Sequence, residues 1–324
     1  MTKFLSSFSI ALLTFCFANA QGEQPNIIWL VSEDQSPEFF PMYGDNTVYL
    51  PHLEALAADS VIYDNMHATT PVCAPARSAI ITGMYPTTLG THNMRAYNEG
   101  RDTNQPELGI PSYSPKFSTD IKPFTTYLRD AGYYCTNSNK QDYNFKISKD
   151  AWDQTCRYCS GEQKANIHWR NRGEGQPFFA VFNFQITHES QIWQQQNNKR
   201  YVTPDEVKNI PPYFPDDPVV REDMATNYSN LVRMDKEIGV IISELKEQGL
   251  YDNTYIFFYS DHGGPFPRHK RAIYDSGTKV PLMIKLPKNA KAGNRNDDLW
   301  SFVDLVPTVL QLAQIPLPNY LQGM

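Results

Sequence analysis

The chain has 324 residues, of which 41% are hydrophobic and 20% are charged, so it can bury a substantial core and is not a disordered chain. Its 29 Lys and Arg residues stand against 35 Asp and Glu residues, which gives a net charge of -6. Because a nucleic-acid backbone attracts proteins that carry an excess of positive charge, we do not expect nucleic acid as a partner.

Residues 1–20 have the pattern of a secretory signal peptide. Lys3 precedes an apolar run over residues 4–18, and the small residues Ala18 and Ala20 frame a cleavage site. The run is shorter than the ~20 apolar residues that a membrane-spanning helix needs. We therefore expect a mature chain of residues 21–324 that is exported to the periplasm or secreted, with no membrane anchor.

Apolar runs that read as strands alternate with amphipathic segments that read as helices. The predicted elements are, in chain order, a strand at residues 26–32, helices at 51–58 and 120–131, a strand at 178–184, a helix at 226–249, a strand at 254–260 and a helix at 301–313. This alternation predicts one α/β domain with a mostly parallel central sheet and helices on both faces. The turn-rich residues 315–324 contain no terminating element, so we expect that a C-terminal subdomain is missing.

Polar side chains follow each predicted strand. Glu33 and Asp34 follow the first, His188 comes shortly after the second, and Asp261 and His262 follow the third. In a parallel sheet these residues share one edge, where clustered carboxylates favour binding of a hard cation such as Ca²⁺ or Mg²⁺. For each acid taken alone, a helix cap or a solvated turn is the alternative. A hydrogen-bonded structural role is the alternative for the histidine.

Residues 73–83, with the sequence CAPARSAIITG, predict a helix that begins at or just after Cys73 and ends at Gly83. The positive end of the helix dipole would stabilise an anion there, and Arg77, one turn further on, would help to hold it. Two alternatives remain for Cys73. It is a buried cysteine that packs as a small apolar residue, or it is a thiolate nucleophile with a lowered pKa.

The sequence Cys-Ala-Pro-Ala-Arg over residues 73–77 resembles the C-x-P-x-R signature of the type I, formylglycine-dependent sulfatases of the alkaline phosphatase superfamily. Further motifs of that family occur in the same order along the chain, namely Glu33-Asp34, SDHG at residues 260–263, SGTKVP at 276–281 and VDLVPT at 303–308. The resemblance implies the fold of that family and hydrolysis of sulfate esters. Similarity to heparan- and algal-polysaccharide-type members implies a sulfated oligo- or polysaccharide substrate.

The resemblance also implies a modified residue and a metal ion. A maturation enzyme would oxidise Cys73 to Cα-formylglycine, whose hydrated aldehyde attacks sulfur and later expels sulfate. A divalent cation, usually Ca²⁺ with Mg²⁺ as the alternative, would contact this residue and a sulfate oxygen. By the same resemblance, the ligands of the cation would be Glu33, Asp34, Cys73, Asp261 and His262.

The remaining roles are carried over residue by residue. Arg77 would orient the hydrate, Lys140 and Lys279 would bind sulfate oxygens, and His188 would protonate the leaving-group oxygen. The chain departs from the family pattern at Asp142, where many relatives carry a histidine two residues after the lysine.

Basic residues beyond these motifs are candidates for contacts with further anionic groups of a sugar polymer. Arg268, His269 and Lys270 belong to a basic run between the third strand and Lys279, while His92 and Arg95 follow the signature helix. A solvated basic surface is the alternative.

Two other functions compete with a sulfatase. The first is a phosphodiesterase or phosphonate hydrolase of the same superfamily, whose two-metal members need additional His and Asp ligands. The second is a catalytically silent protein that binds sulfated glycans, if the maturation enzyme never modifies Cys73.

Overall fold

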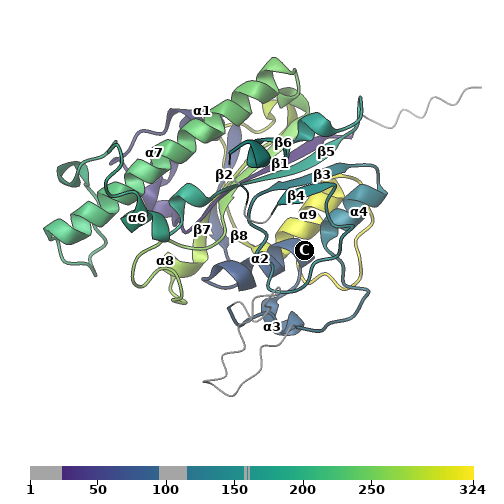
Figure 1. Ribbon diagram of the computed structural model, residues 1–324, viewed down its shortest axis with the longest axis horizontal. Helices are drawn as coiled ribbons and strands as arrows, with labels where there is room; N and C mark the ends of the chain where they lie inside the picture. Colours follow the sequence, from purple (N-terminus) through teal and green to yellow (C-terminus); the bar gives the residue numbers. More distant parts are fainter. Residues whose placement is uncertain (1–23, 95–114, 157–158, 160) are drawn as a thin grey trace, which may run out of the picture.

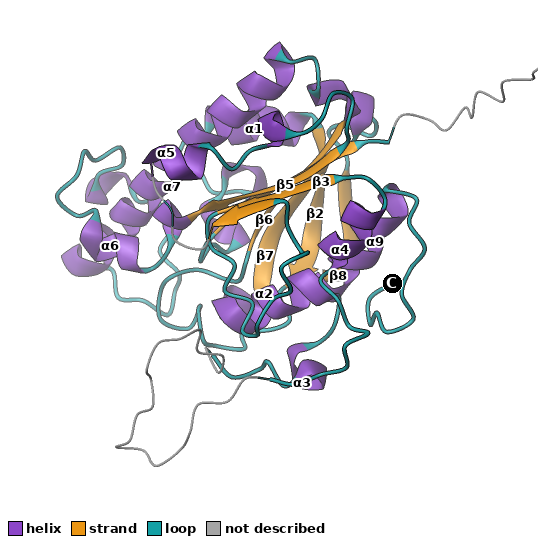
Figure 2. Cartoon of the chain, turned by 45° about the vertical axis from the view of Figure 1, so that its right-hand side comes forward, coloured by secondary structure: helices purple, strands orange, loops and turns teal. Residues whose placement is uncertain are grey.

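The computed structural model describes residues 24–94, 115–156, 159 and 161–324. The expected signal peptide and Arg95 lie outside the described residues. Within them an eight-stranded sheet has the order β4-β3-β5-β1-β6-β7-β2-β8, with helices on both faces (Figures 1 and 2). The strands are β1 Asn26–Ser32, β2 Ser60–His67, β3 Tyr134–Ser138, β4 Gln154–Cys156, β5 Phe178–Phe184, β6 Thr254–Ser260, β7 Lys279–Lys285 and β8 Arg295–Ser301.

The centre of the sheet consists of the three strands that the sequence predicted, and their bounds are those expected. β1 pairs in parallel with β5 on one side and with β6 on the other, with Ile28 opposite Ala180 and Ile256. β7 is antiparallel to both β6 and β2, so its first residue, Lys279, lies at the edge where the parallel strands end. The predicted mostly parallel α/β sheet is confirmed.

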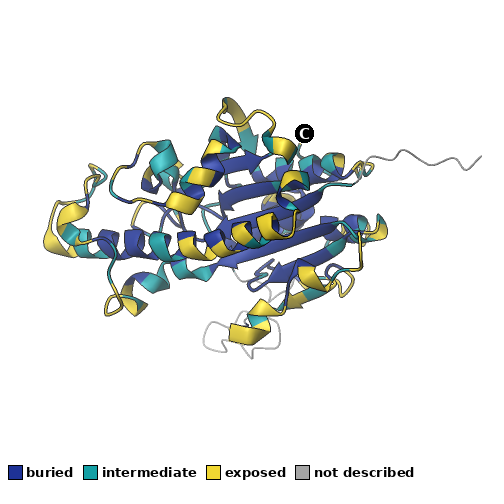
Figure 3. Cartoon of the chain, turned by 90° about the horizontal axis from the view of Figure 1, so that it is seen from above, coloured by how far each residue is buried: buried dark blue, intermediate teal, exposed yellow. Residues whose placement is uncertain are grey.

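Alternate residues of β1 enter two hydrophobic cores, as the period of a strand requires. Ile28 and Leu30 pack in the core beneath α1 (Pro51–Ala58) and α7 (Pro218–Glu247). Trp29 belongs to the core on the opposite face, beneath α2 (Cys73–Thr82), α4 (Phe124–Asp130) and α9 (Leu305–Leu312). Both faces of the central strands are therefore covered, and Figure 3 shows these strands in the colour of buried residues.

Shorter helices lie in the connections. These are α3 Pro86–Leu89, α5 Gly161–Ala165, α6 Ser190–Gln194 and α8 Asp275–Thr278. In the part of the chain that the structure describes, no helix combines the length and the hydrophobicity of a membrane span.

Three helix starts differ from the prediction, and one of them is that of α9, which begins at Leu305 and not at residue 301 because residues 302–304 form a 3₁₀ helix. α7 begins at Pro218 and not at residue 226, because the side chain of Asp217 accepts hydrogen bonds from the amides of Val219 and Val220 and caps a longer helix. α4 begins at Phe124 and not at residue 120, because it starts only after the extended Pro123. The helix expected at residues 51–58 has those bounds.

Candidate active site

The carboxyl ends of β1, β5 and β6 bring the predicted polar residues to one edge of the sheet. Asp34 follows β1 in a left-handed conformation with φ 53°, and its amide donates to Oδ1 of Asp261 over 3.2 Å. Asp261 and His262 directly follow β6, while His188 follows β5 after one turn of 3₁₀ helix at Gln185–Thr187. The parallel order of the strands places these residues together, as expected.

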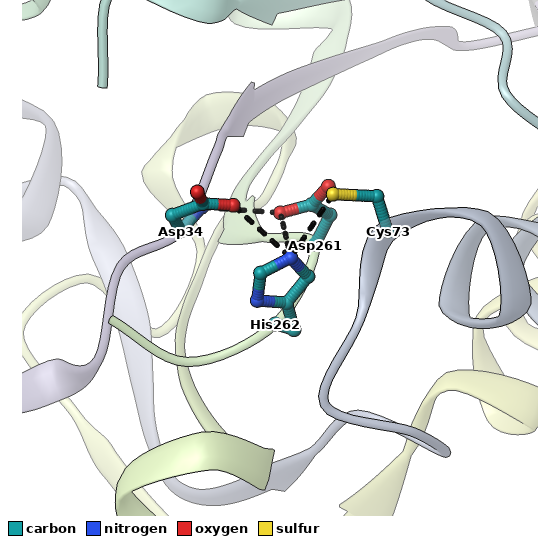
Figure 4. A group of neighbouring side chains, drawn as sticks. All are labelled: Asp34, Cys73, Asp261 and His262. Atoms are coloured by element: carbon teal, nitrogen blue, oxygen red, sulfur yellow. Dashed lines mark hydrogen bonds and ion pairs between the residues drawn. The ribbon is translucent and has the colours of Figure 1, made fainter. Parts of the chain in front are cut away.

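Asp34, Cys73, Asp261 and His262 form a buried cluster whose four ligand-type atoms all lie within 4.8 Å of one another (Figure 4). Nε2 of His262 lies 3.0 Å from Oδ1 of Asp34, 3.7 Å from Oδ1 of Asp261 and 3.2 Å from Sγ of Cys73. Two carboxylates, an imidazole and a sulfur atom therefore face a common point, and they come from three distant parts of the chain.

This cluster has the chemistry of a divalent-cation site. Oδ1 of Asp34 is buried and faces Nε2 of His262 over 3.0 Å. Nδ1 of His262 lies 2.9 Å from the carbonyl oxygen of Gly263, which can only accept, so Nδ1 carries a proton and Nε2 is the nitrogen that faces the carboxylates. Carboxylate oxygens together with Nε2 of an oriented imidazole ring fit a bound cation.

The electrostatics of the cluster lead to the same conclusion. Burial raises the pKa of Asp34, but His262 and Lys270 lower it by more, so that it falls well below its usual range. The pKa of Asp261 is also lowered, because His262 and Arg77 outweigh burial. Burial lowers the pKa of His262, but Asp261, Cys73 and Asp34 raise it well above its usual value. Two buried negative charges thus attract positive charge to this point.

Cys73 is the first residue of α2, as predicted, and its side chain is fully buried. The helix follows the extended residue Val72 and ends at Gly83, which has φ 69°. Burial raises the pKa of the Cys73 thiol, but Lys140 and His262 lower it, with the result that the pKa is about 7. The sulfur atom therefore occupies a site that stabilises an anion.

Arg77, one turn into α2, is buried against two acids. Its Nε donates to Oδ2 of Asp261 over 3.0 Å, and its Nη1 donates to Oδ1 of Asn183 over 2.7 Å. Nη2 lies 3.6 Å from Oε1 of Glu33 and makes no hydrogen bond with a described residue. The guanidinium group is thus rigidly held, with one nitrogen left to donate.

The structure does not bring Glu33 into the cluster around His262, where the resemblance placed it. Oε2 of Glu33 instead accepts a hydrogen bond from Nζ of Lys140 over 2.6 Å, and its other oxygen faces Arg77. The chain turns at Asp34, whose φ is 53°, and the side chains of Glu33 and Asp34 contact different partners. In this structure Glu33 neutralises two buried cations.

Lys140 lies in a loop with an unusual backbone that follows β3. The residues in the left-handed region, which residues with a side chain rarely adopt, are Asn139, Lys140, Asp142 and Asn144. Hydrogen bonds hold the loop, because Nδ2 of Asn183 donates to the carbonyl oxygen of Asn139 and Nδ2 of Asn144 donates to that of Thr91. Burial lowers the pKa of Lys140, but Cys73 and Glu33 raise it by more, so the ammonium stays charged.

Lys270 is part of the cluster, although the sequence assigned it to an outer substrate surface. Its Nζ lies 2.8 Å from Oδ2 of Asp34, 3.1 Å from Oε1 of Glu189 and 3.3 Å from Nε2 of His188. Only 2% of its side chain is exposed, against 23% for His188. The imidazole of His188 is therefore the outermost of these groups.

The pKa of His188 is raised above its usual value. Burial lowers it, but a hydrogen bond to Cys73 and the charge of Asp34 outweigh the effect of burial. Nδ1 of His188 lies 3.0 Å from Oγ of Ser190, which fixes the orientation of the ring. The imidazole of His188 is thus held between the buried sulfur and the solvent.

His269, which we expected to contact substrate, is fully buried instead of lying on the surface. Its Nδ1 lies 3.2 Å from Oγ of Ser36, its Nε2 lies 2.8 Å from the hydroxyl of Tyr213, and its ring stacks on Phe39. Burial lowers the pKa of His269 to about 4, so it is neutral at pH 7. This environment gives His269 a structural position, and the expected substrate contact must be corrected.

The other predicted residues lie outside the cluster. Nζ of Lys279, at the start of β7, donates to Oδ1 of Asn65 over 3.2 Å. Arg268 is exposed, and its guanidinium carbon lies 4.8 Å from the ring centroid of Tyr213 and 4.7 Å from that of Tyr274. The side chain of His92 is exposed.

Two residues of the site were missed by the sequence analysis. Asn183 links Arg77 to the loop of Lys140, and it is the only polar residue in the strand sequence FFAVFNF. Glu189 directly follows His188, and its amide donates to Oδ2 of Asp34 over 2.7 Å. Asn183 could have been found from the sequence, because a polar residue inside an apolar strand indicates a specific role. Nothing in the local sequence distinguished Glu189.

Comparisons with known proteins agree with this geometry. A family model described as Sulfatase matches residues 25–315. An ulvan-active sulfatase of Formosa agariphila is 40% identical over 335 residues, which cover 93% of this chain and 54% of that protein. The human N-sulphoglucosamine sulphohydrolase is 26% identical over 314 residues, which cover 91% of this chain and 62% of that protein. This chain thus spans between half and two thirds of the length of these relatives.

A solved structure, described as a complex with its substrate D-glucosamine-2-N,6-O-disulfate, superposes with a TM-score of 0.69. The match covers 93% of this chain and 78% of that one, at 17% sequence identity. At this level of identity the likeness concerns the fold.

Proposed function

This chain belongs to the type I sulfatases of the alkaline phosphatase superfamily, and from that premise we propose that it hydrolyses sulfate esters of a sulfated carbohydrate. The observation that carries the proposal is the position of Cys73, at the start of α2 and 3.2 Å from Nε2 of His262, beside the carboxylates of Asp34 and Asp261. The named activities of the similar proteins on ulvan and N-sulphoglucosamine support a carbohydrate substrate.

We propose that Cys73 is converted to Cα-formylglycine by a maturation enzyme and that Asp34, Asp261 and His262 hold a divalent cation, preferably Ca²⁺. The hydrated aldehyde supplies the nucleophile, and the cation supplies positive charge to the reacting oxygens. The carboxylates of Asp34 and Asp261 carry two negative charges, which balance the two positive charges of a divalent cation. This balance supports binding of a divalent ion.

The residues around Cys73 suit the charge of a sulfate group. Lys140 and Lys270 present ammonium groups beside the cluster, and the free Nη2 of Arg77 remains available to an oxygen of the modified residue. Donors that are fixed before the reaction stabilise charge that grows on sulfate oxygens. We propose that Lys279 adds a further contact when substrate is present.

We propose that His188 gives a proton to the leaving oxygen of the sugar. Two observations support this proposed role: the raised pKa favours the protonated form, and the ring is partly exposed. We assign Arg268 and His92, which are exposed, to contacts with more distant groups of the glycan. We further propose that residues 1–20 direct export and that residues 21–324 form the catalytic domain.

Mass spectrometry of one tryptic peptide tests the modification. Residues 4–76 contain no Lys or Arg, so trypsin releases Cys73 in a peptide that ends at Arg77. After co-expression with a formylglycine-generating enzyme, we expect the mass of this peptide to fall by the difference between a CH₂–SH and a CHO group. The amino end of the same peptide reports whether the signal peptide has been removed.

Sulfate release from a panel of defined sulfated saccharides tests the activity. We expect turnover that disappears in Cys73→Ala and persists in Cys135→Ser, because Cys135 is buried in the core of β3. An unmodified thiol together with no turnover supports a silent glycan-binding protein. A phosphate diester that is hydrolysed faster than every sulfate ester supports a phosphodiesterase.

A further inference from the structure

Three cationic side chains surround Tyr201, and two of them belong to α7, the long helix labelled in Figure 1. Nζ of Lys236 lies 4.0 Å from the ring centroid of Tyr201, Nζ of Lys199 lies 5.2 Å from it, and the guanidinium carbon of Arg233 lies 5.5 Å from it. Each distance is within the range of a cation–π contact. We call Lys199, Tyr201, Arg233 and Lys236 the Tyr201 cluster.

The fold fixes this cluster in place. Oγ of Ser229 in α7 accepts hydrogen bonds of 3.1 Å from the amides of Tyr201 and Val202, which anchor the loop to the helix. Arg233, one turn further along α7, donates to Oδ1 of Asn230 and to the carbonyl oxygen of Lys199. The spacing of Arg233 and Lys236 places both on one face of the helix, beneath the tyrosine ring.

Within residues 24–94, 115–156, 159 and 161–324, the positive charge of the cluster is not neutralised by an ion pair. Nearby cations have acidic partners, since Arg200 pairs with Glu222 and Lys164 pairs with Glu237. Among the residues that the structure describes, no carboxylate forms an ion pair with a member of the Tyr201 cluster. Like charges held together repel one another, so bound anionic groups would relieve this repulsion.

The cluster is separate from the active site. Asn227 of the same helix is buried and exchanges hydrogen bonds with Gln35, which follows Asp34. Arg233 lies six residues further on, which is about 9 Å along the helix axis. Lys199 and Lys236 are exposed, whereas Asn227 faces the sheet.

We propose that the Tyr201 cluster is a second binding site for the sulfated polysaccharide, distinct from the site that hydrolyses it. The choice of ligand rests on the proposed function, and the match is one of charge, because a sulfated chain presents repeated anionic groups. A polymer held at this cluster keeps its other segments at a high effective concentration near Cys73. Short substrates cannot reach both sites at once, so the Tyr201 cluster does not increase their affinity.

Native gel electrophoresis in gels that contain dextran sulfate tests this inference without any turnover. We expect the chain to be retarded by dextran sulfate and not by uncharged dextran. The variant Lys199→Ala/Arg233→Ala/Lys236→Ala should bind about 10-fold more weakly, and its slope of log affinity against log salt should be smaller by about two, since three contacts are lost. The matched control Lys116→Ala/Lys146→Ala/Lys149→Ala removes the same charge from exposed positions elsewhere.

Equal retardation of the cluster variant and the control overturns the proposal. Equal retardation of the wild type by single-stranded DNA of the same charge density also overturns it, because the surface then binds any polyanion. Cys73→Ala should be retarded like the wild type, so a failure of the proposed hydrolysis leaves this result unaffected. If hydrolysis occurs, the cluster variant should have a raised KM for polymer and an unchanged kcat/KM for a monosaccharide sulfate.

Discussion

Nζ of Lys270 lies 2.8 Å from Oδ2 of Asp34, although 236 residues separate the two in the sequence. The same ammonium group faces Oε1 of Glu189 and Nε2 of His188. A fixed positive charge thus fills the space between three groups that would otherwise suit a metal ion. The ammonium group of Lys270 thus lies directly beside the proposed cation site.

Replacing Lys270 by methionine keeps the length of the side chain and removes the charge. We expect kcat for sulfate release to fall by about 10²–10³, the loss that follows removal of one preorganised donor to a developing negative charge. Steady-state kinetics of Lys270→Met measure the effect, with Lys146→Met as the exposed control. Unchanged kcat in Lys270→Met would show that the ammonium plays no part in the reaction.

Removal of divalent cations should destabilise the protein, because two buried carboxylates then repel each other. At a Ca²⁺ concentration 100 times the Kd, binding stabilises the native state by about 2.7 kcal/mol, which raises the melting temperature by several degrees. Differential scanning calorimetry with Ca²⁺ and with a chelator measures this shift. We expect Asp34→Asn and Asp261→Asn to lose it and the exposed Asp297→Asn to keep it.

The variant Glu33→Gln tests whether Glu33 is a ligand of the cation, as the family pattern implies. Its carboxylate faces Lys140 and Arg77 and not the cluster around His262, so the Ca²⁺-dependent shift should persist in this variant. Loss of the shift in Glu33→Gln would place Glu33 among the ligands of the cation.

The buried His269 should make stability depend on pH. Its pKa is about 4 in the folded protein, below the ordinary value of 6.5, so between these values the unfolded chain binds more protons than the folded chain. Stability should therefore fall as pH decreases from 6.5 to 4, with a contribution from this residue of at most about 3 kcal/mol. Urea unfolding across this range should show a shallower dependence for His269→Asn than for wild type. The exposed His92→Asn is the control, and equal slopes for all three proteins would contradict the prediction.

Close backbone contacts around Gly277 should make this position intolerant of a side chain. A Cβ atom there would lie 2.0 Å from the carbonyl oxygen of Ala272 and 2.3 Å from that of His269. We expect Gly277→Ala to lower the free energy of unfolding by more than about 3 kcal/mol. Gly173→Ala is the matched control, because the nearest atom to its Cβ would be 3.5 Å away. Urea midpoints of the two variants give the comparison, and similar midpoints would refute the expectation.

The parts of the fold that the sequence predicted are those with a strong local pattern. The central strands are uninterrupted apolar runs because both faces are buried, and α7 has apolar residues at helical spacing. β8 was not predicted, since the sequence RNDDLWS is polar and lies exposed at the edge of the sheet. β7 was not predicted either, because Pro281 interrupts it. An edge strand and a strand containing proline depend on tertiary pairing.

The residues of the site also divide into those that the sequence predicted and those that it did not. Asp34, Asp261 and Cys73 could be placed together because each lies at a position that the sheet or the helix start defines. The inward position of Lys270 could not, since it depends on a loop whose amide at Arg271 donates to the carbonyl oxygen of Pro71. Contacts between distant loops leave no periodic trace in the sequence, and so a residue that was assigned to the surface is in fact buried in the site.

The burial of Cys73 in the folded protein bears on when its proposed modification can occur. With α2 docked against the sheet, the side chain of Cys73 is fully buried and lies in a helix. If Cys73 is modified as proposed, we expect the enzyme to act on the nascent or still unfolded chain, because the folded chain buries the thiol. On this proposal, the rate of folding competes with the rate at which Cys73 is modified. A chain that folds before it is modified keeps its thiol.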